Sequence, residues 1–301
     1  MKYILTQPAT QFFGWQIDVF LYSCRSVGIP MEDIHVVCSI DVEISDYFDT
    51  LIKKYPGVVF TYYQDTREDK TYIPSVKQHL LAKHLRVFKE LQSQPLLHVD
   101  SDIAFTRPLQ IDHLLNDDVW YLSDTESYIG YSYVLSKGRD VLEAMLQAAD
   151  INESVVASMQ KASGGAQYLY KNLTPDYLEE VVDVSHKLYR VMVDISNKKV
   201  KEIEGYHPIQ VWTAEMWAIL WVAWKRGKIT AIDKSLDFCW ATDPISRWKE
   251  CAIYHGAGVT NEDDNHFWKS RWVHQLPLLN QDINKTRACY PYYNMLRSAL
   301  A

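Results

Sequence analysis

The stretch that decides the fold is Leu96-Leu97-His98-Val99-Asp100-Ser101-Asp102-Ile103-Ala104-Phe105. It begins as a short apolar run with the alternation that fits a buried strand of a parallel sheet. Two carboxylates, Asp100 and Asp102, then follow one residue apart. Open parallel sheets bind ligands beyond the carboxyl ends of their strands, so we expect both carboxylates to lie at such an edge.

Two carboxylates this close in the chain repel each other unless a positive charge lies between them. A divalent ion that prefers oxygen ligands, such as Mn²⁺ or Mg²⁺, held together with substrate phosphates, satisfies both. The alternative is a solvated turn at the strand end, in which Asp102 caps a backbone amide. The apolar residues on both sides of the pair favour the metal–phosphate interpretation.

The composition limits the class of protein. The chain has 301 residues, of which 48% are hydrophobic, enough for one large domain or two coupled halves. The net charge of −7, without a long basic run, disfavours a binder that relies on neutralising nucleic-acid phosphates, although a local basic patch stays open. No apolar stretch approaches the length of a membrane span, and the N-terminal residues enter a strand without the apolar core of a signal peptide.

The chain has five cysteines, an odd number, which are widely spaced and form no Cys-x-x-Cys motif. This pattern is typical of reduced thiols and not of a disulfide framework or a zinc site. We therefore expect a cytoplasmic protein.

Strand-like and helix-like segments alternate along the first 105 residues, which predicts an α/β fold with a mostly parallel sheet flanked by helices. The predicted strands are 2–7, 33–40, 58–63 and the apolar run that ends at the two carboxylates, and the predicted helices are 11–28, 44–55 and 74–91.

The remaining chain continues with mixed elements and has no convincing linker. We expect strands at 119–122, 130–135, within 229–240 and at 252–255, helices at 139–149, 154–161, 175–196 and 212–226, and loops at 163–167 and 198–204. Helix 212–226 is apolar on nearly every side and should be buried. We predict one domain over 1–301, with halves 1–135 and 136–275 and a polar, aromatic tail at 276–301.

Four motifs together resemble a known family. They are Asp100-x-Asp102, Gly164-Gly165-Ala166-Gln167, Trp212-x-x-Glu215-Met216, and His255-Gly256 followed by Phe267-x-Lys269. In this order they resemble the GT-A (Rossmann-like) fold of nucleotide-sugar-dependent glycosyltransferases over residues 1–275. The chain is most similar to the retaining family-8-like group and to the hydroxyproline arabinosyltransferase and peptidyl-serine galactosyltransferase relatives.

The resemblance implies a hexosyl- or pentosyltransferase that uses Mn²⁺ or Mg²⁺ and a nucleotide diphosphate sugar, with a UDP-sugar as the first candidate. Residues 1–135 would bind the nucleotide sugar, and 136–275 would supply the acceptor and catalytic half. The acceptor is open between a glycan, a hydroxylated peptide, a lipid and a modified nucleobase. Stereochemistry and oligomeric state are open as well.

The resemblance also assigns the metal site. Asp100, Asp102 and His255 would hold the ion that bridges the two donor phosphates, with Asp100 contacting the donor too. Lys269 would neutralise the leaving diphosphate, and Arg271 is an alternative for that role. On their residue type alone, His255 would be a buried histidine at a strand end and Lys269 a surface lysine.

The resemblance assigns further residues to donor binding and to the reacting centre. Thr6 and Gln7 end the first strand, where such folds bind the nucleoside. Lys77 would reach the donor ribose or phosphate, unless it is a surface charge. Gln167 would lie near the anomeric carbon, unless it begins a helix after a glycine loop.

Glu215 lies in a helix that carries four tryptophans, where an acidic residue is costly unless it is paired or used. It could bind acceptor hydroxyls, or act as a general base if the enzyme inverts. The alternative is an exposed first-turn glutamate after Thr213 as N-cap, which helix electrostatics favour.

Other classes compete with this interpretation. A haloacid-dehalogenase-like phosphotransferase also uses Asp-x-Asp at a strand end, but usually near the start of its domain. A glycosidase needs carboxylates at least ~5 Å apart across a sugar, which neighbouring residues suit poorly. A catalytically inactive GT-A-like binding module and a glycosyltransferase acting on hydroxylated nucleobases in DNA stay open, the latter disfavoured by the acidic charge.

Overall fold

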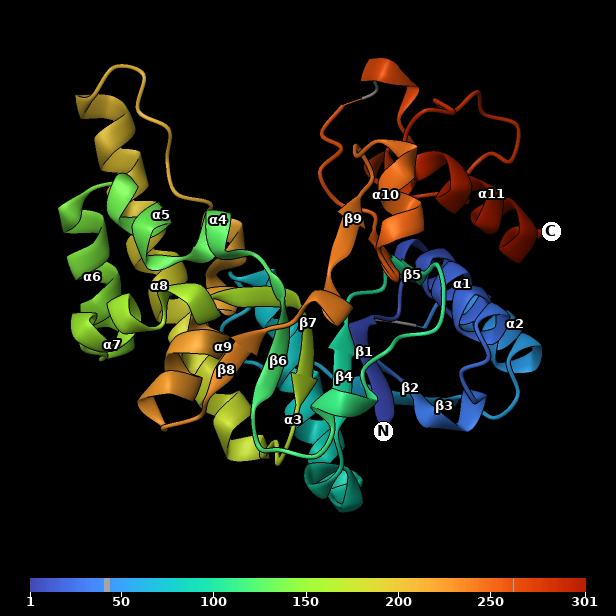
Figure 1. The fold of residues 1–301 in the computed structure, drawn as a ribbon, viewed down its shortest axis with the longest axis horizontal. Helices are drawn as coiled ribbons and strands as arrows, with labels where there is room; N and C mark the ends of the chain where they lie inside the picture. Colours follow the sequence, from blue (N-terminus) through green and yellow to red (C-terminus); the bar gives the residue numbers. More distant parts are fainter. Residues whose placement is uncertain (41–43, 262) are drawn as a thin grey trace. The chain divides into compact units, whose positions relative to one another are not determined.

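Seven strands form the main sheet of this computed structural model, which describes residues 1–40, 44–261 and 263–301 (Figure 1). Their order is β3-β2-β1-β4-β7-β6-β8. Pairs β1–β2, β2–β3 and β6–β8 are parallel, whereas β6–β7 is antiparallel. The strands are β1 (Lys2–Pro8), β2 (Ile34–Ile40), β3 (Val59–Gln64), β4 (Leu96–Val99), β6 (Trp120–Asp124), β7 (Gly164–Tyr170) and β8 (Thr230–Ile232). The predicted α/β fold with a mostly parallel sheet is confirmed.

A second, three-stranded sheet has the order β5-β10-β9. Its strands are β5 (Ile103–Phe105), β9 (Phe238–Trp240) and β10 (Ile253–His255). Strand β10 pairs antiparallel with β5 and parallel with β9. The strand predicted before the acidic pair ends at Val99, the residues after the pair form a second strand, β5, and the pair lies in the turn between them.

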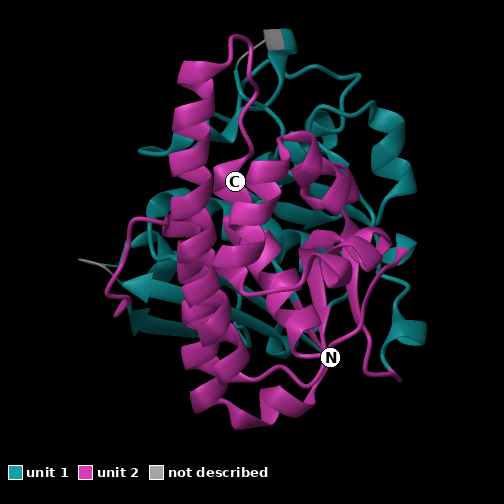
Figure 2. Ribbon diagram, turned by 90° about the vertical axis from the view of Figure 1, so that its left-hand side faces the viewer, with its two compact units in different colours: residues 1–64, 98–115, 234–301 teal, residues 65–97, 116–233 magenta. Residues whose placement is uncertain are grey.

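The chain forms two compact units, each assembled from separate segments (Figure 2). Unit 1 comprises 1–64, 98–115 and 234–301, and unit 2 comprises 65–97 and 116–233. A compact unit is not by itself a folding domain. The single domain over 1–301 with halves at 1–135 and 136–275 therefore stays a prediction.

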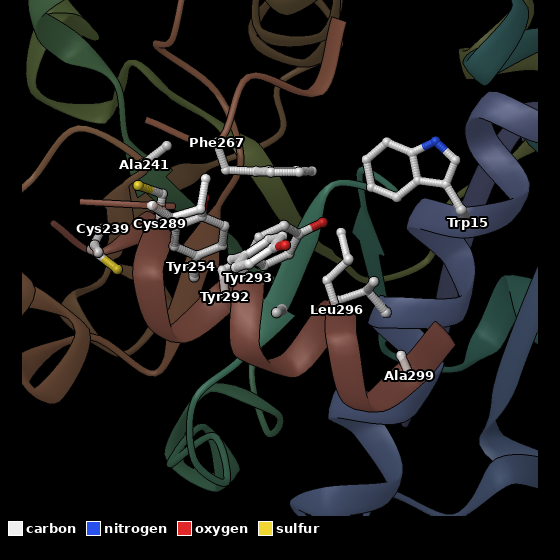
Figure 3. Packing of buried hydrophobic residues seen from close by; sticks show 14 of the residues in the cluster. Trp15, Cys239, Ala241, Tyr254, Phe267, Cys289, Tyr292, Tyr293, Leu296 and Ala299 are labelled. Carbon is white, nitrogen blue, oxygen red and sulfur yellow. The ribbon is translucent and has the colours of Figure 1, made fainter. Parts of the chain in front are cut away.

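In unit 1, an aromatic core joins helix α1 to the C-terminal helix α11 (Figure 3). Trp15, Tyr254, Phe267 and Tyr292 are buried in it. The helices of the unit are α1 (Gln11–Ser26), α2 (Tyr47–Lys54), α10 (Ile245–Glu250) and α11 (Cys289–Leu300). The segment predicted as a tail thus contains a helix, whose buried residues recur at helical spacing: Cys289, Tyr292, Tyr293, Leu296 and Ala299.

In unit 2, the long helix α8 packs against α3, α6 and α9. Thr174 caps its first turn by accepting a hydrogen bond from the backbone N–H of Tyr177 (3.4 Å), and Pro175 opens it. Every residue of α9 from Ala214 to Trp224 is buried, as predicted, but Trp212 precedes the helix and is 69% exposed, so the prediction of burial from residue 212 is wrong there. The helices are α3 (Val76–Val87), α4 (Glu126–Ile129), α5 (Tyr131–Ser136), α6 (Arg139–Ala149), α7 (Glu153–Ser158), α8 (Pro175–Glu202) and α9 (Ala214–Lys225).

Three local predictions are wrong. Segment 130–135 forms helix α5 and not a strand, and only Val134 of that helix is buried, as on one face of a surface helix. Segment 163–167 leads into strand β7, and segment 198–204 largely continues α8. Position 164 in strand β7 requires glycine, because a Cβ there would lie 2.7 Å from the backbone oxygen of Ser123 in the neighbouring strand.

The five cysteines, Cys24, Cys38, Cys239, Cys251 and Cys289, are free and buried. Burial raises the pKa of each thiol. Among the described residues, none of the helices combines the length and apolarity needed to cross a membrane.

Candidate functional site

The acidic turn lies between β4 and β5, directly after Val99. Strand β5 pairs antiparallel with β10, so Ile103 lies opposite His255. The backbone N–H of Gly256 donates to the carbonyl oxygen of Asp102 at 2.8 Å. This pairing brings His255 to the turn, and the predicted position of the carboxylates at the strand's carboxyl end is confirmed.

Asp100, Asp102 and His255 converge on one point. Each offers a ligand atom, and these atoms all lie within 4.8 Å of one another. The Nε2 atom of His255 is 3.4 Å from Oδ1 of Asp102 and 3.9 Å from Oδ2 of Asp100. Two carboxylates and an imidazole are a donor set that Mn²⁺ accepts, and the buried carboxylate of Asp102 calls for a cation. The three side chains fit a divalent ion, and their role as ligands stays a prediction.

Lys269 also reaches this turn. Its Nζ atom contacts Oδ2 of Asp102, whose side chain is almost fully buried. Burial acts to raise the pKa of Asp102, but the Lys269 ammonium and the His255 imidazole outweigh it and hold that pKa well below its usual range. Asp102 is 5% exposed, so this carboxylate stays charged in a protein interior through its two neighbours.

Two aromatic residues that the sequence analysis did not single out pack against His255. The ring of Trp240 is stacked on the imidazole, with centroids 5.9 Å apart and planes at 9°. The ring of Phe238 is tilted against the imidazole, with the two ring centroids 5.3 Å apart. Their alternation in Phe238-Cys239-Trp240 was the available signal, because alternate residues of a strand face the same side.

Thr6 and Gln7 are buried at the end of β1. The hydroxyl of Thr6 lies 3.0 Å from Nε2 of His98 on β4, so a protein partner already holds it. Contact of Thr6 and Gln7 with a nucleoside stays a prediction.

Lys77 and Glu215 form an ion pair within unit 2, with Nζ and Oε1 3.0 Å apart. The hydroxyl of Tyr72 contacts the other carboxylate oxygen and accepts a hydrogen bond from the backbone N–H of Glu215 at 3.0 Å. Glu215 is 6% exposed, so the alternative of an exposed first-turn glutamate is wrong, and Thr213 makes no capping hydrogen bond. The side chain of Lys77 is partly exposed, at 18%, so its contact with the donor stays a prediction beside the alternative of a surface charge.

Tyr72 is the residue of this group that the sequence analysis missed. Burial, followed by the nearby Glu215 carboxylate, raises the pKa of its hydroxyl. Its position depends on Arg67, which donates to the carbonyl oxygen of Tyr72 at 3.0 Å and to the hydroxyl of Ser75 at 2.7 Å. No local periodicity marks such a residue.

A serine–histidine–aspartate arrangement lies beside Tyr72, a residue of the loop between β3 and α3. The hydroxyl of Ser75 is 2.9 Å from Nε2 of His186, whose Nδ1 is 3.2 Å from Oδ2 of Asp69. Ser75 is fully buried and its hydroxyl donates to the carbonyl oxygen of Tyr72. A nucleophile has to be reachable by its substrate, so this group fixes the loop and is not a hydrolytic triad.

Gln167 lies in β7, and the alternative that it begins a helix is wrong. It is 0% exposed, and its Oε1 accepts a hydrogen bond from the hydroxyl of Ser123 at 2.5 Å. Its Nε2 has no hydrogen-bond partner among the described residues. Its place near the anomeric carbon stays a prediction.

The fold is similar to solved glycosyltransferase structures. The apo structure of the bifunctional glycosyltransferase WbbM matches with a TM-score of 0.52 and 8% identity, over 90% of this chain and 48% of that chain. The glycosyltransferase GlyE of Streptococcus pneumoniae TIGR4 matches at 0.45 and 9%, over 98% and 60%. Mouse xyloside xylosyltransferase 1 matches at 0.40 and 9%, over 85% and 97%.

This chain spans about half the length of WbbM and less than two thirds of GlyE. At these identities the likeness bears on the fold alone, and the WbbM match supports a GT-A-type glycosyltransferase fold. The sequence matches no family model and no curated protein.

Proposed function

We propose that this protein is a metal-dependent glycosyltransferase that transfers a sugar from a nucleotide diphosphate sugar to a hydroxyl acceptor. The observation that carries the proposal is the convergence of Asp100, Asp102 and His255 at the carboxyl end of β4, in a fold similar to that of a glycosyltransferase. A UDP-sugar is the first candidate donor, with a hexose or pentose as the transferred group. The resemblance to the family-8-like and hydroxyproline arabinosyltransferase group supports these narrower choices.

Asp100, Asp102 and His255 would hold Mn²⁺ or Mg²⁺. The bound ion would neutralise charge on the donor diphosphate. Transfer breaks the bond between the sugar and the diphosphate and forms one to the acceptor oxygen, which loses its proton. Lys269 already lies beside Asp102, so its ammonium is available to neutralise the diphosphate that leaves.

Thr6, Gln7 and Lys77 are the proposed donor-binding residues, and Gln167 and Glu215 the proposed catalytic ones. Both carboxylate oxygens of Glu215 already contact protein groups, Lys77 and Tyr72. This arrangement favours a role for Glu215 in positioning over a role as a free general base. A cytoplasmic location stays a prediction from the unpaired cysteines.

The test is a panel of nucleotide sugars incubated with the full chain and Mn²⁺, with release of nucleoside diphosphate as the readout. Asp102→Asn removes a ligand charge at the acidic turn. Asp194→Asn is the matched control, because Asp194 is an exposed residue of α8. We expect metal-dependent release that chelator and Asp102→Asn abolish and Asp194→Asn leaves unchanged.

Release that persists in chelator, or in Asp102→Asn, would rule the metal mechanism out. Hydrolysis of simple phosphate esters with no release from nucleotide sugars would favour the phosphotransferase. Tight metal-dependent binding of a nucleotide sugar without any turnover would favour the inactive binding module.

A further inference from the structure

The side chains of Phe238, Trp240 and His255 line one face of the small sheet in unit 1. Strands β9 and β10 are parallel, and their register places Trp240 directly beside His255. Phe238, two residues earlier, projects to the same face. The rings of Phe238 and Trp240 meet edge to face, 4.8 Å apart at 67°. The imidazole therefore packs against a pair of aromatic rings that hold each other.

The hydrogen bonding of His255 departs from that of most metal-binding histidines. Such a histidine usually donates its second ring N–H to a carboxylate, carbonyl or water, which fixes the plane of the ring. Here Nε2 faces the two carboxylates, whereas Nδ1 is buried and has no hydrogen-bond partner among the described residues. The orientation of the ring has to come from another source.

We propose that Trp240 is the positioning residue that orients His255 toward the metal held at Asp100 and Asp102. The proposal rests on the metal site of the proposed function. Stacking at 9° restricts rotation of the imidazole out of its plane, and that rotation would swing Nε2 away from Asp102. Phe238 meets the same ring at 59°, so it contacts the ring without setting its plane.

The turn after His255 supports the indole. Gly258 has a φ of +87°, and a Cβ placed there would lie 3.5 Å from Cε3 of Trp240. The chain that follows His255 thus approaches Trp240 closely. Removal of the indole would leave space beside the imidazole, and the ring could then adopt orientations that do not face the carboxylates.

Groups that orient a metal ligand typically contribute about 10–100-fold to metal affinity. A stacked aromatic contact lies at the low end of this range, so we expect about a tenfold loss of Mn²⁺ affinity in Trp240→Ala.

The experiment measures Mn²⁺ alone, without nucleotide, on the full chain. Continuous-wave EPR gives the affinity, and pulsed EPR gives the ¹⁴N coupling of an imidazole nitrogen bound to Mn²⁺. The variants are Trp240→Ala, Trp240→Leu, which keeps apolar volume without a ring, and Trp240→Phe, which keeps a ring. Trp248→Ala is the matched control, because Trp248 packs on Tyr254, the neighbour of His255, at 5.3 Å and not on the imidazole.

We expect Trp240→Ala and Trp240→Leu to weaken binding about tenfold and to diminish the ¹⁴N coupling. Trp240→Phe should retain most of both, and Trp248→Ala should retain the coupling fully. If Trp240→Ala does not fold, as judged by circular dichroism, Trp240→Leu decides.

Wild-type affinity and coupling in Trp240→Leu would overturn the role of Trp240 while leaving the metal site intact. An equal loss in Trp248→Ala would also overturn it, since the effect would then be a general loosening of the core. If the wild type binds no Mn²⁺, or if Asp102→Asn binds it equally well, the proposed metal function fails as well.

Discussion

Lys269 contacts Oδ2 of Asp102, the carboxylate whose other oxygen lies 3.4 Å from Nε2 of His255. One buried carboxylate thus contacts two groups that carry, or can carry, positive charge. A divalent ion bound by Asp102 has to share this carboxylate with the Lys269 ammonium or replace it. The side chain of Lys269 is 29% exposed, so the ammonium has room to move outward.

This relationship predicts opposite effects of Lys269→Gln on binding and on turnover. Mn²⁺ alone should bind about fivefold more tightly, because loss of a nearby positive charge at a partly exposed site is worth roughly 1 kcal/mol. Release of nucleoside diphosphate should fall at least tenfold, because the leaving group loses a neutralising charge. Calorimetric titration with Mn²⁺ and a turnover assay measure the two effects. Lys249→Gln, at an exposed position of α10, is the control. Weaker Mn²⁺ binding in Lys269→Gln would contradict the competition.

The Lys77–Glu215 pair makes a prediction about stability. Lys77→Met removes the cation beside the buried carboxylate of Glu215, which keeps its Tyr72 contact, and breaking a buried pair typically costs about 3–5 kcal/mol. Because the Lys77 side chain is partly exposed, we expect about 2–3 kcal/mol. The double variant Lys77→Met, Glu215→Gln should recover part of this loss. Urea unfolding of the wild type, the two single variants and the double variant measures the coupling free energy between Lys77 and Glu215. If Glu215→Gln abolishes turnover without changing stability, Glu215 acts in catalysis and not in positioning.

The two glycines of β7 should differ in their tolerance of alanine. A Cβ on Gly164 would collide with the Cβ of Leu122 and lie 2.7 Å from the backbone oxygen of Ser123, and neither atom can yield without breaking strand pairing. A Cβ on Gly165 would mainly meet the end of the flexible Met216 side chain. We expect Gly164→Ala to lower the free energy of unfolding by about 3 kcal/mol and Gly165→Ala by about 1 kcal/mol. Thermal and urea unfolding give the ranking, and equal losses would show that the sheet relaxes around both.

Asp65 gives a pH-dependent prediction. Arg67 binds its carboxylate through two nitrogens, at 3.0 and 2.9 Å, and both side chains are nearly buried. Burial acts to raise the pKa of Asp65, but the hydrogen bonds and charge of Arg67 outweigh it and lower the pKa to about 2. A folded pKa below the unfolded value, about 3.9, contributes stability above pH 4 that is lost as the pH falls toward 2.

Asp65→Asn should therefore destabilise the protein by about 2.5 kcal/mol at pH 7, and the difference from wild type should shrink between about pH 4 and pH 2. Urea unfolding at pH 7, 4 and 3 measures this difference, with the exposed Asp194→Asn as the control. A difference that does not depend on pH would mean that the loss comes from packing and not from ionisation.

Within the candidate site, the acidic pair was predictable because it carries a local signal. The apolar run before Asp100 and Asp102 predicted a strand end, and the structure places both residues there. His255 and Lys269 followed from resemblance to a family and not from spacing along the chain. Trp240 and Tyr72 were missed, because their contacts are with residues remote in sequence.

The sequence alone determined the alternating strands and helices of the first 105 residues, the acidic strand end and the buried helix α9, since each depends on the periodicity of neighbouring residues. Only the tertiary structure decided that β5 pairs with β10, and so that His255 lies beside Asp102. It also decided that Glu215 is paired and that Gln167 is buried in a strand. These outcomes depend on the register of distant segments and on close packing at glycines, and no window of neighbouring residues contains either.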